Sequence, residues 1–80
     1  MIEERINNEI KTADKNYGSF NSTHEVYGVI QEEIDEFWDL VKLKSKTILH
    51  EKEMIAELIQ ISAIAKRAAI QIENHQIKYL

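Results

Sequence analysis

Hydrophobic residues recur every three or four positions along most of the chain, which is the spacing of one face of an α-helix. In the first segment Ile2, Ile6 and Ile10 stand four apart, which predicts a helix from about Ile2 to Ala13. An apolar stripe this thin does not hold a helix unless the helix docks on another element. We therefore expect this helix to act as a lid or a brace.

A loop and a helix start follow in the sequence. The stretch from Asn16 to Ser22 is rich in asparagine, serine and glycine, which favour turns. Ser22 and Glu25 have the spacing of a capping box, in which each side chain satisfies a backbone N–H of the other residue. This pattern predicts a second helix from Thr23 to about Lys44.

A short turn near Ser45 to Ile48 is expected to lead into a third helix, from about Leu49 to Ile77. One apolar stripe of this helix comprises Met54, Leu58, Ile61, Ala65, Ala68, Ala69 and Ile72. A second stripe, about 150° away, comprises Ile55, Ile59, Ala63, Ile70 and Ile77. A single pair of helices covers only one of these faces. The second face is therefore expected to meet another subunit in a dimer or tetramer, for example as a four-helix bundle.

Composition agrees with an all-α domain that spans residues 1–80. The 80 residues include no proline and only two glycines, so helices are favoured over hairpins. The chain has no cysteine, which excludes disulfides and fits a reducing compartment such as the cytoplasm. A net charge of −4 without a basic stripe argues against duplex nucleic acid as a partner. No apolar run approaches the length of a membrane span, so no membrane partner is expected.

Glutamates interrupt the apolar face of the second helix. Its stripe comprises Val26, Ile30, Ile34, Phe37 and Val41. Glu33 falls inside this stripe, Glu36 falls at its margin, and Glu32 lies one step further out. A carboxylate on an apolar face must be paired, metal-bound or protonated, because burying it without a partner is costly.

If the second and third helices pack antiparallel, Glu33 and Glu36 can face Glu57 and Gln60. Three carboxylates and one amide oxygen form a site for a hard cation, and Mg²⁺ prefers such oxygen ligands. Glu53, one turn before Glu57, could add further negative charge.

A plainer interpretation remains open, in which Glu57 pairs with Lys42 or Arg67 and no metal is needed. The histidines His24, His50 and His75 are interpreted as helix-start or surface residues, and no catalytic histidine is expected.

The pairing of Glu32-Glu33-x-x-Glu36 with Glu57-x-x-Gln60 resembles the MazG-like all-α nucleotide pyrophosphohydrolases. Their hallmark is E-E-x-x-E on one helix and E-x-x-D on the next, so Gln60 departs from the pattern. The resemblance covers roughly residues 17–67.

The resemblance implies Mg²⁺-dependent hydrolysis, with Mn²⁺ as a possible substitute, of a nucleoside triphosphate to the monophosphate and pyrophosphate. It implies Glu33, Glu36 and Glu57 as metal ligands, Gln60 in the fourth ligand position, and a catalytic role for Glu32 in orienting water or binding a second ion.

Substrate contacts are proposed from side-chain chemistry. The cations Lys42, Lys66 and Arg67 could neutralise phosphate charge, whereas Asn21, Tyr27 and Trp38 could meet the base or sugar. Because an amide at Gln60 removes one negative charge, the alternative is a helical module that binds a nucleotide or a partner protein without turnover.

Overall fold

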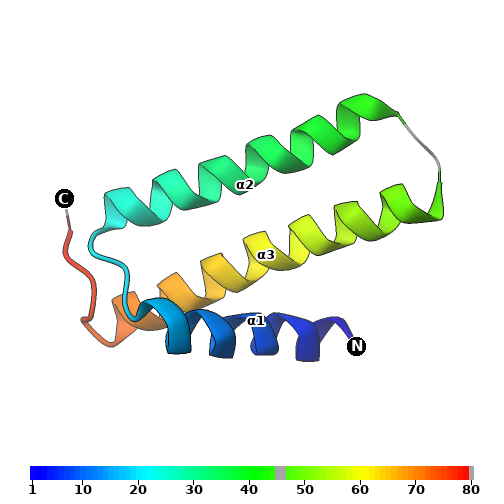
Figure 1. Ribbon diagram of the computed structural model, residues 1–80. Coiled ribbons are helices and arrows are strands. Elements are labelled where there is room, and N and C mark those ends of the chain that lie inside the picture. Colours follow the sequence, from blue (N-terminus) through cyan, green and yellow to red (C-terminus); the bar gives the residue numbers. More distant parts are fainter. Residues whose placement is uncertain (45–46, 80) are drawn as a thin grey trace.

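The computed structural model describes residues 1–44 and 47–79, and within them it contains three α-helices and no strand. They are α1 (Ile2–Tyr17), α2 (Thr23–Leu43) and α3 (Ile48–Glu73). The two long helices α2 and α3 form an antiparallel hairpin, and α1 runs along α3 (Figure 1). The molecule is elongated, with extents of 42 × 26 × 19 Å. The predicted all-α class, with a short first helix and a long antiparallel pair, is confirmed.

Helix α1 is a brace on α3. It extends one turn beyond the predicted end and stops at Gly18, whose φ of 69° is easily adopted only without a side chain. Two side-chain bonds tie it to α3: Lys66 Nζ donates to Asn7 Oδ1 at 2.9 Å, and Arg67 Nε donates to Asp14 Oδ1 at 2.7 Å. The thin apolar stripe is thus supplemented by polar contacts.

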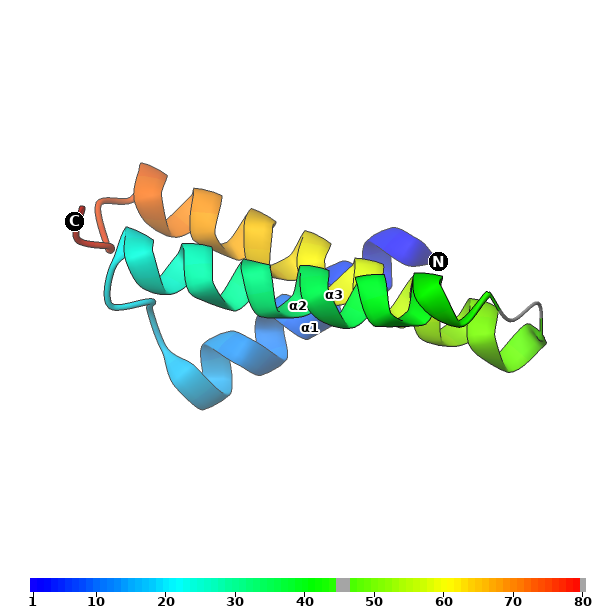
Figure 2. The same cartoon turned by 90° about the horizontal axis from the view of Figure 1, so that it is seen from above.

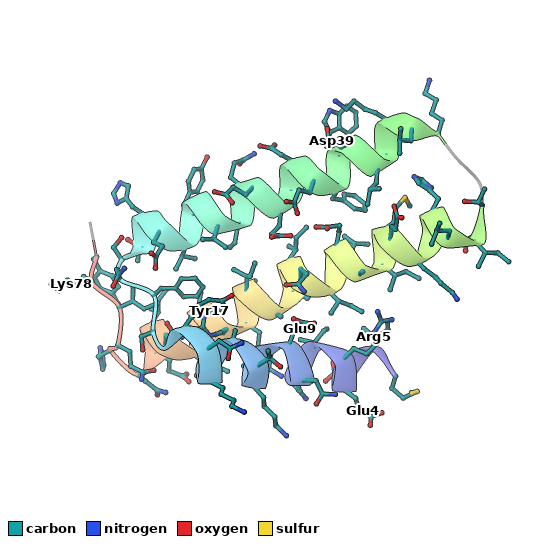
Figure 3. The ribbon with its side chains drawn as sticks, viewed as in Figure 1. Glu4, Arg5, Glu9, Tyr17, Asp39 and Lys78 are labelled. Carbon is teal, nitrogen blue, oxygen red and sulfur yellow. The ribbon has the colours of Figure 1, made fainter. Side chains whose placement is uncertain are left out.

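The start of α2 lies where the sequence predicts it, but only half of the capping box forms. The Glu25 backbone N–H donates to Ser22 Oγ at 3.2 Å. The Glu25 carboxylate accepts from the backbone N–H of Asn21, at 2.9 Å, and not from that of Ser22 as predicted. The C-terminal segment, in which Figure 3 labels Lys78, lies beside the start of α2. There the Thr23 N–H donates to the carbonyl of Lys78 at 2.9 Å.

Helix α3 begins at Ile48, and Thr47 caps it by accepting a hydrogen bond from the His50 N–H at 3.1 Å. The turn was predicted near Ser45 to Ile48, and of that stretch Ser45 and Lys46 lie outside the described residues.

The prediction that His50 is a surface residue is wrong. Its side chain is buried, and its Nε2 lies 2.6 Å from the carbonyl oxygen of Leu40. The last carbonyls of a helix have no partner within that helix. His50 stands one turn into α3 and meets such a carbonyl at the end of α2. His24 and His75 are exposed, as expected.

Helix α3 ends at Glu73, one turn before the predicted Ile77. The chain reverses through His75, which has φ 57°, and the N–H of Gln76 donates to the carbonyl of Gln71 at 2.8 Å. Ile77 thereby turns back into the core instead of extending the stripe. Burial of Ile77 with Phe20 and Ala68 removes its apolar side chain from water, which favours this reversal over one more helical turn.

The core lies at the end of the hairpin near both the α1–α2 loop and the C-terminal segment. It comprises the buried residues Phe20, Ala68 and Ile77, against which Val26, Val29, Ile64 and Ile72 pack. Ile59 and Ala63, on the second stripe of α3, are also buried, and α1 of the same chain packs on this face. Ile55 and Ile70 of the same stripe remain exposed, so the expectation that another subunit meets this face stays a prediction.

None of the helices in residues 1–44 and 47–79 combines the length and the apolar character that a membrane span needs.

Candidate functional site

Three carboxylates meet at the middle of the seam between α2 and α3. Glu33 and Glu36 come from α2 and Glu57 comes from α3, and one oxygen of each lies within 4.8 Å of the others. Glu33 and Glu57 are partly buried, whereas Glu36 is exposed. We call these three residues the acidic cluster.

The antiparallel geometry explains why the spacing of the glutamates brings them together. Glu33 and Glu57 face the seam from opposite helices. A residue three positions later lies about 60° back around the helix, since each residue turns by roughly 100°. Because the helices are antiparallel, this rotation carries Glu36 on α2 and Gln60 on α3 toward the same side of the hairpin.

The negative charges of the acidic cluster repel one another. The pKa of Glu33 is raised from 4.5 to about 7, first by burial, then by hydrogen bonds with the carboxyl groups of Glu57 and Glu36 and by their negative charges. Glu57 Oε2 is buried, and no hydrogen-bond donor in the described residues reaches it. A buried oxygen of this kind is costly unless a proton or a cation satisfies it.

A cavity of about 540 Å³ opens beside Glu33, between α1, the loop after it and the α2–α3 seam. Of the residues predicted from the sequence, Glu33, Gln60, Asn21 and Arg67 line it. The cavity is also lined by residues that the sequence analysis did not propose for the site, among them Tyr17, Phe20, Glu25, Val29 and Ile64. It has room for a small planar group, with aromatic and polar atoms in its wall.

An open hollow of about 430 Å³ lies further along the seam, toward the end of α2. Its wall includes Glu36 and Glu57 of the acidic cluster together with Asp39 and Glu53. Glu53 therefore lies near the cluster, where the sequence suggested that it could add charge. The concentration of acids makes this hollow favourable for cations and unfavourable for free anions.

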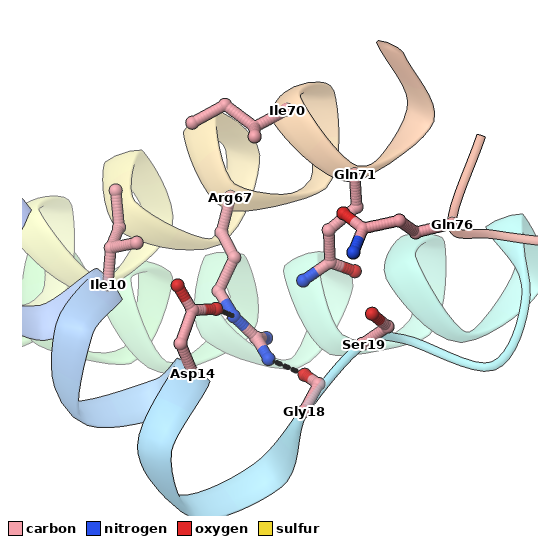
Figure 4. A pocket seen from close by; sticks show the side chains of 8 residues that line it. All are labelled: Ile10, Asp14, Gly18, Ser19, Arg67, Ile70, Gln71 and Gln76. Atoms are coloured by element: carbon pink, nitrogen blue, oxygen red, sulfur yellow. Dashed lines mark hydrogen bonds and ion pairs between the residues drawn. The ribbon is translucent and has the colours of Figure 1, made fainter. Parts of the chain in front are cut away.

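Arg67 occupies a structural position (Figure 4). Its side chain is buried, donates to Asp14 and to the carbonyl oxygen of Gly18, and lies with its guanidinium carbon 4.7 Å from the centre of the Phe20 ring. It thus joins α1 and the following loop to α3. The interpretation in which Arg67 pairs with Glu57 is wrong, because the guanidinium is bonded to Asp14 and Gly18 instead, and no donor in the described residues reaches Glu57 Oε2.

Lys42 does not pair with Glu57 either. It forms an exposed ion pair with Asp39 at 3.2 Å, and its Nζ lies 6.0 Å from the ring centre of Trp38. Trp38 is exposed, Lys66 is bonded to Asn7, and neither of them nor Lys42 belongs to the lining of the cavity beside Glu33.

Asn21 is exposed and donates to the Glu25 carboxylate at 2.9 and 3.2 Å from its backbone and side-chain nitrogens. Glu32 is exposed and lies outside the acidic cluster, so its catalytic role stays a prediction.

The residues that sequence analysis missed, such as Phe20 and Tyr17, lie in or next to an irregular loop. Helical periodicity carries no signal there. The strongest available hint was the presence of aromatic residues within a turn-forming stretch.

Comparison of the chain with protein-family models, with curated proteins and with solved structures finds no match.

Proposed function

We propose that this chain binds Mg²⁺, or Mn²⁺ in its place, through Glu33, Glu36 and Glu57, and that it hydrolyses a nucleoside triphosphate to the monophosphate and pyrophosphate. The observation that carries the proposal is the convergence of three carboxylates around a buried Glu57 oxygen that no donor in residues 1–44 and 47–79 reaches. Carboxylate oxygens are the ligands that Mg²⁺ prefers, so the residues present fit this ion. Membership of the MazG-like family is part of the same proposal.

A bound divalent ion would neutralise phosphate charge and activate a water molecule. Side chains of the chain itself would affect how such an ion binds. With a pKa of about 7, Glu33 is partly protonated at neutral pH when no cation is present and must release that proton on binding, so that affinity rises with pH. Gln60 contributes a neutral amide oxygen at the same side of the hairpin, and Glu32 orients water in this proposal.

The cavity beside Glu33 is the proposed position of the nucleoside. Its wall offers the Phe20 ring and the polar side chains of Asn21 and Gln60 within one space. The phosphate chain of a nucleotide bound there would extend past Glu33 to the acidic cluster. Trp38, Lys42 and Lys66 lie outside this wall, which disfavours them as contacts for a nucleoside in this cavity.

The alternative function is a module that binds a nucleotide or a partner protein without turnover. Gln60 favours it, because the amide leaves the cation site with one negative charge fewer than the E-x-x-D pattern would supply. With either function, we expect the chain to self-associate as a dimer or tetramer and to be located in the cytoplasm.

Pyrophosphate release separates the two functions. The chain would be incubated with each ribonucleoside and deoxyribonucleoside triphosphate in the presence of Mg²⁺ or Mn²⁺, and pyrophosphate would be detected by a coupled assay. We expect release that Glu33→Gln abolishes and that Asp35→Asn leaves intact, since Asp35 lies on the solvent side of the same helix. Nucleotide binding without pyrophosphate release would support a nucleotide-binding module. The absence of both binding and release would contradict hydrolysis and nucleotide binding alike.

The role of Gln60 is tested by Gln60→Asp, which restores the carboxylate of the E-x-x-D pattern. We expect it to tighten Mg²⁺ binding, as measured by calorimetry, because it adds one negative charge beside the cluster. A decrease in affinity would contradict the placement of Gln60 at the cation.

A further inference from the structure

A further cavity lies where the C-terminal parts of α1 and α3 meet. Its volume is about 250 Å³. The ends of α1 and α3 and the C-terminal segment lie at the same end of the molecule (Figure 1 and Figure 2). We call this space the Gln71 cavity. Its wall includes Ile10, Asp14, Arg67, Ile70, Gln71 and Gln76.

The Gln71 cavity is distinct from the cavity beside Glu33, although Arg67 belongs to the walls of both. Phe20, which lies against the guanidinium of Arg67, lines only the cavity beside Glu33. Gln71 lines only the cavity that carries its name, and no residue of the acidic cluster does so. A molecule bound in the Gln71 cavity therefore does not touch the proposed hydrolytic site.

Gln71 directs an amide donor into this cavity. The residue is only 5% exposed, and its Oε1 accepts a hydrogen bond from the Phe20 backbone N–H at 2.9 Å. That bond fixes the orientation of the amide, because an N–H needs the oxygen and not the nitrogen. Figure 4 shows the nitrogen directed toward Arg67 and Asp14, and it donates to no group in the described part of the chain. A donor on so buried a side chain favours a ligand that brings an acceptor.

Asp14 offers an acceptor to the same cavity. Its Oδ1 accepts from Arg67 Nε at 2.7 Å, whereas its second oxygen, Oδ2, accepts from no donor in residues 1–44 and 47–79. Figure 4 shows Asp14 and Gln71 on either side of Arg67. A ligand that lies along Arg67 therefore meets a hydrogen-bond acceptor at one end and a donor at the other.

Charge and size restrict the ligand further. Arg67 and Asp14 are the charged residues of the wall and are paired with each other, so the wall as a whole is neutral and favours a neutral ligand over an ion. Sites for drug-sized ligands have volumes of roughly 300–1,000 Å³. This cavity is smaller and fits a molecule of about one ring. Ile10 and Ile70 supply apolar contact for the faces of such a ring.

We propose that the Gln71 cavity binds a neutral planar heterocycle that contains a cyclic amide, as the base uracil does. The ring C=O accepts from Gln71 Nε2, and the ring N–H donates to Asp14 Oδ2. A ring holds these two groups on one edge, whereas a trans peptide bond points its N–H and C=O in opposite directions. An extended peptide therefore does not satisfy both residues with one amide. The site does not depend on the proposed hydrolysis or on a divalent ion.

Nuclear magnetic resonance of the isotopically labelled chain, titrated with uracil in the presence of EDTA, tests the site. We expect a saturable shift of the side-chain NH₂ signals of Gln71, with the methyl signals of Val29 and Ile64 in the cavity beside Glu33 unchanged. Dimethyluracil, in which methyl groups replace both N–H hydrogens, is the control ligand and should produce no saturable shift. The proposal is overturned if uracil shifts nothing, if it shifts only Val29 and Ile64, or if dimethyluracil binds as tightly as uracil.

The variant Asp14→Asn keeps an oxygen for Arg67 and replaces the second carboxylate oxygen by an amide donor. It should weaken uracil binding about 10-fold or more, because a hydrogen bond to a charged group is lost. Glu3→Gln is the matched control, since it also removes one negative charge from an exposed position of α1. Circular dichroism checks that both variants remain helical. A folded Asp14→Asn variant that binds uracil as tightly as Glu3→Gln would also overturn the proposal, and if Asp14→Asn does not fold, the comparison of uracil with dimethyluracil on the unaltered chain decides.

Discussion

Replacing Glu33 by glutamine tests the electrostatics of the acidic cluster. Without a divalent ion, the three carboxylates repel one another at alkaline pH, and Glu57 Oε2 has no donor among the described residues. Glutamine keeps the shape of the side chain, removes one negative charge and offers an N–H to its neighbours. We therefore expect Glu33→Gln to stabilise the metal-free protein above neutral pH.

The pKa of Glu33 determines the pH window. It is 4.5 for an ordinary glutamate and about 7 in the folded chain, mainly because of burial and then because of Glu57 and Glu36. Below 4.5 both folded and unfolded states are protonated, so the shift has no effect on stability. Between these values the unfolded chain ionises while the folded chain keeps its proton, so the free energy of unfolding falls as pH rises. Above about 7 the destabilisation is complete.

The magnitude follows from the same two values. A rise from 4.5 to about 7 corresponds to at most roughly 3 kcal/mol of lost stability. Glu33 is only partly buried, and solvent screening reduces the expected effect to about 1–2 kcal/mol. Glu33→Gln should regain this amount at pH 8 and progressively less as the pH is lowered toward 4.5.

Urea unfolding followed by circular dichroism, in EDTA and at several pH values, provides the measurement. Asp35→Asn serves as the control, because it removes one exposed charge from the same helix and should leave the pH profile unchanged. Added Mg²⁺ or Mn²⁺ should stabilise the unaltered chain and the control but not Glu33→Gln. Two results would contradict the convergence of the carboxylates. One is a Glu33→Gln variant less stable than the control at pH 8, and the other is a pH profile of unfolding free energy that is the same for Glu33→Gln and the control.

Three further substitutions test the packing of the brace, the cap and the C-terminal segment by urea unfolding. Arg67→Ala should lower the free energy of unfolding by about 2–3 kcal/mol because it removes a buried guanidinium with three contacts, whereas Lys66→Ala beside it should cost less than about 0.5 kcal/mol. Ser22→Ala should cost about 1 kcal/mol, since it removes the side-chain cap of α2, and a loss below about 0.3 kcal/mol would contradict that role. Ile77→Ala should cost about 2–3 kcal/mol and exposed Ile70→Ala much less, and equal losses would show that Ile77 does not belong to the core.

The sequence by itself determined the helices and their chemistry. Helix positions follow from apolar periodicity and from the Ser22 cap, which are interactions within a few residues along the chain. The placement of Glu33 inside an apolar stripe was visible for the same reason. The pairing of Glu33 and Glu36 with Glu57 could be anticipated because a short turn between two long helices makes them antiparallel.

Only the tertiary structure decided which face of each helix meets which neighbour. It placed α1 on the second stripe of α3, buried Arg67 against Asp14 and Phe20, and turned Ile77 back into the core. Each of these contacts joins residues far apart in the sequence, and several stripes of comparable hydrophobicity compete for the same partner. Which stripe packs against which helix depends on how each helix is rotated and on the area buried over the whole molecule. A pattern within a few residues of the sequence does not contain that information.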